Sequence, residues 1–216
     1  MSQAIVVIGG GALGALALDA AREGAVVIAA DSGLDHAVAA GLRPHVLVGD
    51  FDSISAAGRM WAYAHELEIH EHPFDKDLTD AELAISRALT VPDVRQLLVI
   101  GGLDDPDDPR LDHLLGTLLA LGHPSLGELA SVRAVLGNTR FSVLHPGRQA
   151  VLDVEIGQTF SLLALHGPCS GVSVSGARWP LDNATLRGTE ALGVSNEATE
   201  RTEVQVTSGV LTVVIP

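Results

Sequence analysis

The sequence predicts an α/β N-terminal domain with a mainly parallel sheet, followed by a small all-β C-terminal domain of the sandwich or barrel type. Up to about Leu144, apolar strands alternate with helical segments, which is typical of an α/β layer. From Arg148 onward, short alternating runs separated by glycine, proline or asparagine extend over roughly 65 residues. The junction is expected at His145–Gln149, so the expected domains are residues 1–144 and 149–216.

The first domain is expected to contain six strands with helices in most of the gaps. The strands are expected at the apolar runs Ala4–Ile8, Ala25–Ala30, His45–Val48, Glu68–His70, Gln96–Ile100 and Ser131–Leu136. Helical spacing of apolar residues marks Thr79–Leu89, and it also marks a stripe formed by Leu111, Leu114, Leu115, Leu118 and Leu119. In the second domain, the runs "AVLDVEI", "TFSLLAL", "GVSVSGA", "TEVQVTS" and "VLTVVI" indicate strands.

Composition and charge restrict the class of protein and its partners. The 216 residues are 47% hydrophobic, which is enough for a sizeable core, and the formal charge is −14. Such a charge repels nucleic acid and anionic membrane surfaces, so neither is an expected partner, and a polyanionic substrate needs a metal or a local basic cluster. Cys169 is the single cysteine, and charged residues interrupt the first apolar stretch well short of a membrane span. We therefore expect a soluble cytoplasmic protein.

The stretch "VVIGGGALGALALDAAREGAVVIAAD" has the form of a dinucleotide-binding fingerprint. Gly9, Gly11 and Gly14 form a G-x-G-x-x-G array after an apolar strand, and Asp31 ends the next strand. This pattern supports the hypothesis of a Rossmann-type oxidoreductase or redox sensor. However, the same glycines also serve a tight strand-to-helix turn in any α/β fold, and that hypothesis gives the acidic loops no function.

Acidic residues follow several of the expected strands, where ligands bind in an open α/β sheet. In "GDFDS", Asp50 and Asp52 can converge on one hard cation while Phe51 turns back to the core. The alternative is a solvated, Asp-rich turn.

The segment "DKDLTD" brings carboxylates and a lysine to the start of a helix. Asp77 and Asp80 flank a capping box of Thr79 and Glu82, whose free backbone N–H groups favour anions, and Lys76 lies beside them. Acidic residues also favour a helix N-terminus for its dipole alone, so Lys76 can equally be there to neutralise them.

In "RLDH", Arg110 can donate two parallel hydrogen bonds to a phosphate. Asp112 can be an N-cap, and His113 can satisfy a local hydrogen bond rather than act in acid–base chemistry. Carboxylates, a lysine and an arginine at successive strand ends together predict a site for a metal-bound polyphosphate, because phosphoryl-type transfer needs charge neutralisation and positioning.

The motifs "AADSG", "GDFDS", "DKDLTD", "RLDH", "GARWPL" and "VSNE", in this order, resemble the thiamine pyrophosphokinase (thiamine diphosphokinase) family over nearly the whole chain. The resemblance implies transfer of a pyrophosphoryl group from MgATP to the hydroxyl of thiamine, giving thiamine diphosphate and AMP. It also implies a homodimer with active sites between the subunits.

The resemblance also assigns residues to roles. The metal ligands it implies are Asp50, Asp52, Asp77 and Asp80; the ATP-binding residues are Asp31, Lys76, Thr79, Arg110 and His113; the catalytic residues are Asp52, Asp80 and Asp112. Trp179 would offer a flat face to the thiamine rings, and Ser195 and Asn196 would add hydrogen bonds. The alternatives are a core or interface role for Trp179, and a β-turn for Ser195 and Asn196. The general base stays open between Asp80, Asp112 and late proton loss to solvent.

The chain departs from the family pattern in two loops. After Asp31 it has Ser32, Leu34 and Asp35, where the family usually has a second glycine and an Ala-Asn pair. The approach to Arg110 is "GGLDDPDDPR", whose insertion Asp104–Pro109 is acidic and has two prolines; it can lengthen the loop, alter nucleotide contacts or bind a further cation. A catalytically silent thiamine-binding module is a further hypothesis.

Overall fold

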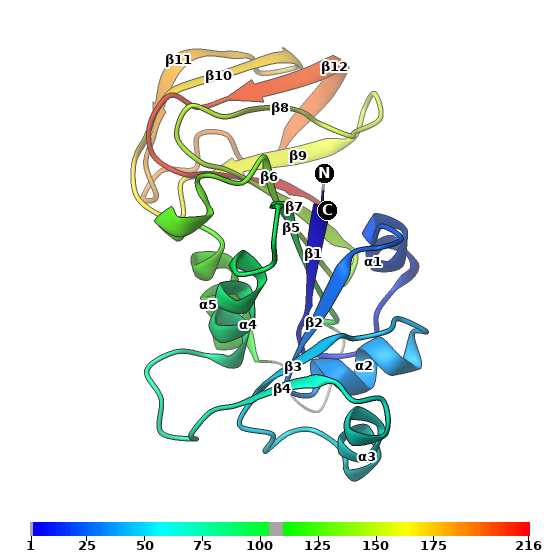
Figure 1. Cartoon of the computed structure of the whole chain (residues 1–216). Helices are drawn as coiled ribbons and strands as arrows, with labels where there is room; N and C mark the ends of the chain where they lie inside the picture. The colour runs from blue at the N-terminus through cyan, green and yellow to red at the C-terminus, as the bar shows by residue number, and fades with distance from the viewer. Residues whose placement is uncertain (1, 104–109) are drawn as a thin grey trace. The chain divides into compact units, whose positions relative to one another are not determined.

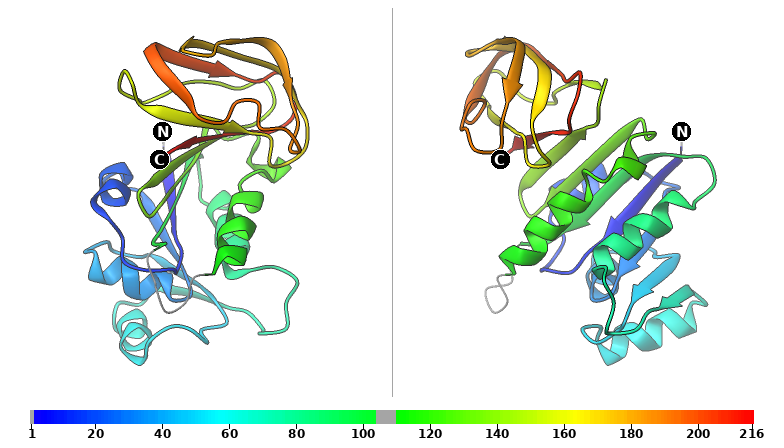
Figure 2. Two further views of the ribbon diagram at one scale, coloured as in Figure 1. Left: turned by 180° about the vertical axis from the view of Figure 1, so that it is seen from behind. Right: turned by 90° about the vertical axis from the view of Figure 1, so that its left-hand side faces the viewer.

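The computed structural model describes residues 2–103 and 110–216, and its secondary structure is mixed β structure with few helices (Figures 1 and 2). The chain divides into two compact units, one of residues up to Ala120 together with Ala134–Asn138, the other of Leu121–Arg133 and Thr139–Pro216. The units therefore do not divide at the expected junction, His145–Gln149. The functional domains 1–144 and 149–216 stay a prediction.

The first unit is built on a parallel sheet. Its strands are β1 (Ser2–Val7), β2 (Val26–Ala30), β3 (Val46–Gly49), β4 (Glu68–Glu71) and β5 (Val94–Gly101), in the order β5-β1-β2-β3-β4. All four pairings are parallel. β1, β2 and β3 are almost entirely buried, which explains their continuous apolar runs. β6 (Ser131–Leu136) is shared between the units, and each of the six expected strands is present to within two residues at either end.

Helices cover both faces of this sheet. They are α1 (Ala15–Ala20), α2 (Gly33–Ala39), α3 (Ala56–Ala64), α4 (Asp80–Leu89) and α5 (Leu111–Ala120). α4 packs on β1, β2 and β3, and α2 packs on β1 and β2 from the opposite side (Figure 1). The predicted capping box is confirmed, since Thr79 and Glu82 exchange side-chain and backbone hydrogen bonds at the start of α4. No helix of the described residues is long and apolar enough to cross a membrane.

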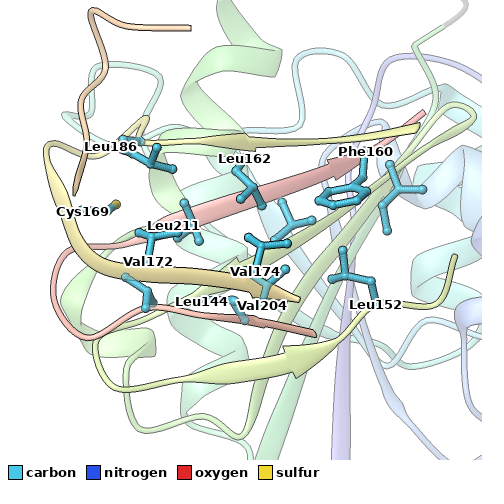
Figure 3. Close-up of a cluster of buried hydrophobic side chains, with 14 of the residues drawn as sticks. Leu144, Leu152, Phe160, Leu162, Cys169, Val172, Val174, Leu186, Val204 and Leu211 are labelled. Carbon is cyan, nitrogen blue, oxygen red and sulfur yellow. The ribbon is translucent and has the colours of Figure 1, made fainter. Parts of the chain in front are cut away.

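The second unit is antiparallel. After a 3₁₀ turn, η1 (Pro124–Leu126), it contains β7 (Thr139–Leu144), β8 (Gln149–Val151), β9 (Thr159–Leu163), β10 (Cys169–Ala177), β11 (Leu181–Leu186), β12 (Asn196–Gln205) and β13 (Leu211–Ile215). The strand order is β7-β13-β9-β12-β10-β11, and β8 pairs with β12. The strands surround an apolar core that includes Phe160, Leu162, Val172 and Leu211 (Figure 3).

A buried histidine makes the stability of this second unit sensitive to pH. His145 is 3% exposed, and its Nε2 lies 3.2 Å from the carbonyl oxygen of Leu121. Burial lowers the pKa of His145; the bond to Leu121 opposes this shift, and the nearby His166 and Arg148 add to it. Below 6.5, the ordinary pKa of a histidine side chain, the unfolded chain therefore binds a proton that the folded chain resists.

We expect the free energy of unfolding to fall as the pH drops through about 6.5 toward the lower folded pKa of His145, by at most about 1.4 kcal/mol per pH unit for this group. His145→Gln, whose amide can still donate to Leu121, should lose less stability over the same range. Urea denaturation of both proteins between pH 7.5 and 5 measures the difference. Parallel pH profiles would contradict this role for His145.

Candidate active site

Three carboxylates meet beyond the carboxyl ends of β2 and β3. Asp31 follows β2, and Asp50 and Asp52 follow β3. One oxygen from each of these residues lies within 4.8 Å of the other two. This is the convergence of Asp50 and Asp52 expected of "GDFDS". Asp31, which the family resemblance assigns to ATP binding, lies in the same group.

The backbone after β3 turns sharply to present both acids. Phe51 has a positive φ of 64°, and its side chain is 6% exposed in a core cluster with Leu34 and Ile54. A non-glycine residue in this region is uncommon and persists only where the surroundings determine it. Because Phe51 is anchored in the core, the residues on either side of it face the site.

Gly49 allows the backbone after β3 to lie close to the side chains of Asp31 and Asp80. Its φ is 151°, and a Cβ at this position would lie 3.1 Å from the Asp31 Cβ and 3.2 Å from the Asp80 Oδ1. A larger residue at position 49 would therefore push Asp31 and Asp80 away from the sheet edge.

Asp31 is the most buried of the three acids, with 6% of the residue exposed. Its Oδ2 accepts hydrogen bonds from the hydroxyl of Ser53 at 2.5 Å and from the backbone N–H of Ser53 at 3.3 Å. Its Oδ1 is buried and has no hydrogen-bond partner among the residues that the structure describes. Burial raises the pKa of Asp31 against the opposing bonds from Ser53, and the charges of Asp80 and Asp52 raise it further.

These residues fit a hard divalent cation. Mg²⁺ and Ca²⁺ take oxygen ligands, carboxylates above all. A buried carboxylate oxygen without a partner is costly, and a cation beside it removes that cost. Asp31 Oδ1 is such an atom, and Asp50 and Asp52 supply further oxygens beside it.

Lys76 connects this group to α4. Its Nζ lies 2.5 Å from Asp50 Oδ2 and 3.2 Å from Asp80 Oδ1. Burial acts to lower the pKa of Lys76, but hydrogen bonds to Asp50 and Asp80 outweigh it, so the pKa is raised and the amine stays charged. The same lysine lowers the pKa of Asp50. Lys76 therefore does neutralise neighbouring acids, one of the two roles that the sequence left open.

The remaining residues of "DKDLTD" lie less close to the three acids. Asp77 is exposed, and in the described part of the chain no hydrogen bond or ion pair joins it to the group. The hydroxyl of Thr79 is used in the capping box with Glu82. Asp77 as a metal ligand and Thr79 as an ATP contact stay predictions.

The "RLDH" residues form a cluster of their own at the start of α5. The guanidinium of Arg110 donates to both carboxylate oxygens of Asp112, at 3.0 and 2.9 Å, and also contacts His113 Nε2. All three side chains are exposed. The hydrogen bond from Arg110 lowers the pKa of Asp112 to about 2. The acidic insertion Asp104–Pro109 lies outside the described residues.

In the second unit, Trp179 presents its ring to solvent at the end of β10. The residue is 54% exposed, and the guanidinium carbon of Arg178 lies 4.9 Å from the ring centroid. Asn196 is 3% exposed, and its amide accepts from the Trp179 N–H at 3.1 Å and donates to the Trp179 carbonyl at 2.8 Å. Asn196 thus holds the backbone of Trp179, a role that the sequence did not indicate.

Ser195 lies in the turn before β12, which is one of the two alternatives expected. It has a positive φ of 57°, and its N–H donates to the hydroxyl of Ser161 at 3.0 Å. The Ser195 side chain is exposed to solvent.

Sequence reasoning missed two residues that support the acidic group. Ser53 is within the quoted motif "GDFDS", and a hydroxyl directly after a ligand pair is a signal that could have marked it. Arg59 donates to the carbonyl of Phe51 at 2.6 Å. It lies eight residues further on, and nothing in the sequence marks it.

Comparison with known proteins assigns the chain to a family. A family profile described as "Thiamin pyrophosphokinase, catalytic domain" matches residues 19–129. A second one, described as "Thiamin pyrophosphokinase, vitamin B1 binding domain", matches residues 149–211. The chain belongs to the thiamin pyrophosphokinase family. The resemblance inferred from the six motifs is thereby confirmed.

Two curated members of the thiamin pyrophosphokinase family show the extent of the similarity. The thiamine pyrophosphokinase of Bacillus subtilis (strain 168) is 27% identical over 171 residues, which cover 79% of this chain and 77% of the relative. Thiamine pyrophosphokinase 1 of Oryza sativa subsp. japonica is 26% identical over 176 residues, which cover 77% of this chain and 63% of the relative.

Solved structures of thiamin pyrophosphokinases share the fold. The crystal structure of the Bacillus subtilis protein superposes with a TM-score of 0.80 at 23% identity, covering 100% of this chain and 98% of the other. The structure from Candida albicans gives a TM-score of 0.77 at 13% identity, with coverage of 99% and 89%.

The dinucleotide-binding hypothesis gains no support from these comparisons. The catalytic-domain match begins at residue 19, after the glycine array. In the structure, a Cβ on Gly9 would lie 2.5 Å from the Ser32 hydroxyl, and one on Gly10 would lie 2.7 Å from the Gly102 carbonyl oxygen. Gly9 and Gly10 therefore allow the loop after β1 to pack closely against its neighbours.

Proposed function

We propose that this member of the thiamin pyrophosphokinase family transfers a pyrophosphoryl group from MgATP to the hydroxyl of thiamine, producing thiamine diphosphate and AMP. The observation that carries the proposal is the buried, unpartnered Oδ1 of Asp31 beside Asp50 and Asp52 in the described part of the chain. That arrangement suits a divalent cation at the strand ends where an α/β sheet binds its ligands.

In this proposal Asp31, Asp50 and Asp52 hold Mg²⁺, and Asp80 and Asp77 complete its surroundings. A bound Mg²⁺ would neutralise charge on the polyphosphate and help to orient it. Asp50 and Asp80 also hold Lys76 in place, at 2.5 and 3.2 Å, so its ammonium group is directed to the same site. The raised pKa of Lys76 keeps that group charged at neutral pH.

The chain's own residues supply positioning and charge rather than a covalent intermediate. Lys76 and Arg110 would bind phosphate oxygens, with His113 and Thr79 near the nucleotide. Arg110 is paired with Asp112, and its planar fork can turn to a phosphate in the same bidentate way. Holding the thiamine hydroxyl in line with the β-phosphorus then lowers the barrier by orientation.

Asp112 is a weak candidate for the proton acceptor. The pKa of Asp112 is lowered to about 2 by its bond to Arg110, so it is a weak base at neutral pH. Asp80 has an Oδ1 that is buried and 3.2 Å from Lys76, beside the loop that carries Asp50. The proton of the thiamine hydroxyl would then pass to Asp80 or be lost late to solvent, and Asp52 would act in the reaction as a ligand of the cation.

The segment that matches the vitamin B1 binding domain profile would bind thiamine. In this proposal residues 1–144 bind MgATP, and residues 149–216 bind thiamine and form the dimer. Trp179 supplies an exposed aromatic face for the cationic thiazolium or the pyrimidine, Asn196 orients it, and Ser195 adds a hydrogen bond. A homodimer and a cytoplasmic location complete the proposal; the mass in solution, measured by light scattering, tests the former.

One assay tests the reaction directly. The protein is incubated with ATP, Mg²⁺ and thiamine, and the nucleotides are separated. AMP formed in proportion to thiamine diphosphate is the expected result. ADP would indicate transfer of a single phosphoryl group, and thiamine binding without any nucleotide product would indicate a catalytically silent module.

Trp179→Ala is expected to raise the KM for thiamine about tenfold, because a cation–π contact contributes roughly 0.5–2 kcal/mol. The KM for ATP should stay within about twofold of the wild type, since the ATP residues lie on other elements. Trp179→Phe keeps an aromatic face and is the matched control, with a smaller rise. Equal KM values for thiamine in all three proteins would remove Trp179 from the thiamine site.

A further inference from the structure

We propose that Arg59 is a positioning residue that holds the Asp50–Phe51–Asp52 turn in its metal-binding conformation. The inference rests on the proposed function, because it concerns the same three carboxylates. It goes beyond it in assigning a role to α3, which supplies none of the residues discussed for substrate or metal.

The contact that carries the inference is local and well defined. An Nη of Arg59 donates to the carbonyl oxygen of Phe51 at 2.6 Å. Phe51 is the residue with φ of 64°, and the peptide N–H that follows it, that of Asp52, donates to Asp50 Oδ1 at 3.2 Å. The orientation of the Phe51–Asp52 peptide thus determines where both carboxylates lie, and Arg59 holds the carbonyl of that peptide.

The hydrogen bond from Arg59 stabilises the unusual backbone conformation of Phe51. A positive φ at a bulky residue is strained and needs surrounding contacts to persist. The side chain of Phe51 supplies one of these contacts through the core, and the bond from Arg59 supplies a second through the main chain. A hydrogen bond from a charged donor to a carbonyl is stronger than a neutral one.

Arg59 is itself fixed by the start of α3. Ser55 is the N-cap of this helix, and its carbonyl accepts from the Arg59 N–H at 3.0 Å. The carboxylate of Asp35 on α2 accepts from the Ser55 N–H at 2.8 Å and from the Ser55 hydroxyl at 2.5 Å. Asp35 is one of the positions where the chain departs from the family pattern. By accepting these two hydrogen bonds from the N-cap residue, it fixes the position of the first turn of α3, which carries Arg59.

Gly58 makes this approach of Asp35 possible. A Cβ at position 58 would lie 2.2 Å from Asp35 Oδ1 and 2.9 Å from its Cγ. Gly58→Ala would therefore displace Asp35 from Ser55, and with it the first turn of α3. This provides a way to disturb Arg59 without changing Arg59 itself.

Binding of Mn²⁺, measured by the EPR signal of the free ion, tests the inference without relying on turnover. Arg59→Met is expected to weaken Mn²⁺ binding about tenfold, the lower end of the effect of residues that orient metal ligands. Arg59→Lys, which can still donate to the Phe51 carbonyl, should recover part of the loss. Gly58→Ala should weaken binding in the same direction. Arg43→Met, at an exposed arginine before β3, is the matched control and should bind as the wild type does.

The results separate this inference from the proposed function. Wild-type Mn²⁺ affinity in folded Arg59→Met would overturn the positioning role. If that variant does not fold, wild-type affinity in Gly58→Ala would overturn it. Wild-type protein that binds Mn²⁺ but forms no AMP would refute the proposed reaction and leave the role of Arg59 intact. Wild-type protein that binds no Mn²⁺ would overturn both.

Discussion

Asp52→Asn is expected to lower the rate of AMP formation from ATP and thiamine by about a thousandfold, which corresponds to about 4 kcal/mol of lost transition-state stabilisation. The substitution removes one negative charge from the three acids that would hold the cation, while nearly preserving the shape of the side chain. Because Asp52 is exposed, the melting temperature should change little. Initial rates at saturating Mg²⁺ and a thermal melt measure the two quantities.

Asp19→Asn provides the control for Asp52→Asn. Asp19 is an acid on α1, so the change in net charge is the same but occurs away from the three carboxylates. It should leave the rate unchanged. Asp52→Asn with wild-type activity would show that this carboxylate does not act in the reaction.

Asp31→Asn is expected to change activity and stability in opposite directions. The folded pKa of Asp31 is raised by burial, so its protonated form stabilises the fold at low pH and this contribution is lost as the pH rises through that pKa. At pH 7 without metal, the buried carboxylate is therefore a cost that asparagine removes. We expect a gain of roughly 1 kcal/mol, or about 2–4 °C in Tm, together with a loss of about a hundredfold or more in activity.

Ser53→Ala is the control that distinguishes removal of the buried charge of Asp31 from loss of the hydrogen bond that holds the loop. It removes the hydroxyl that donates to Asp31 Oδ2 at 2.5 Å and leaves the carboxylate in place. Its Tm should fall, because the buried charge then has one partner fewer. Thermal melts at pH 7 with EDTA compare the variants, and a lower Tm for Asp31→Asn would contradict the view that the carboxylate is destabilising in the metal-free protein.

Local patterns were sufficient for much of the site. The D-x-D spacing after a buried strand predicted that Asp50 and Asp52 converge, and the S/T-x-x-E pattern predicted the cap made by Thr79 and Glu82. Both features depend on residues only two or three positions apart. The family followed from the order of six such motifs, which the two domain matches confirm.

Other features of the site could not be predicted, because they depend on contacts that no local pattern describes. The amide of Asn196 is buried against the backbone of Trp179, seventeen residues away, and this contact had no sequence signal. Asp112 was a candidate base, but its pairing with Arg110 makes it a weak one. Arg59 carried no sequence signal either, because the partner of its side chain is a main-chain carbonyl, and any residue has one.

The sequence alone determined the mainly parallel sheet of the first unit, the short β runs of the second and the family, because period, turn residues and short motifs are local properties of the chain. Only the tertiary structure decided which side chains share one environment. It placed Asp31 with Asp50 and Asp52, left one oxygen of Asp31 buried without a partner among the described residues, and set Lys76 between Asp50 and Asp80. Burial and electrostatic fields arise from segments that meet only after folding, so the pKa shifts and the support of the acidic turn by α2 and α3 do not follow from any single stretch of residues.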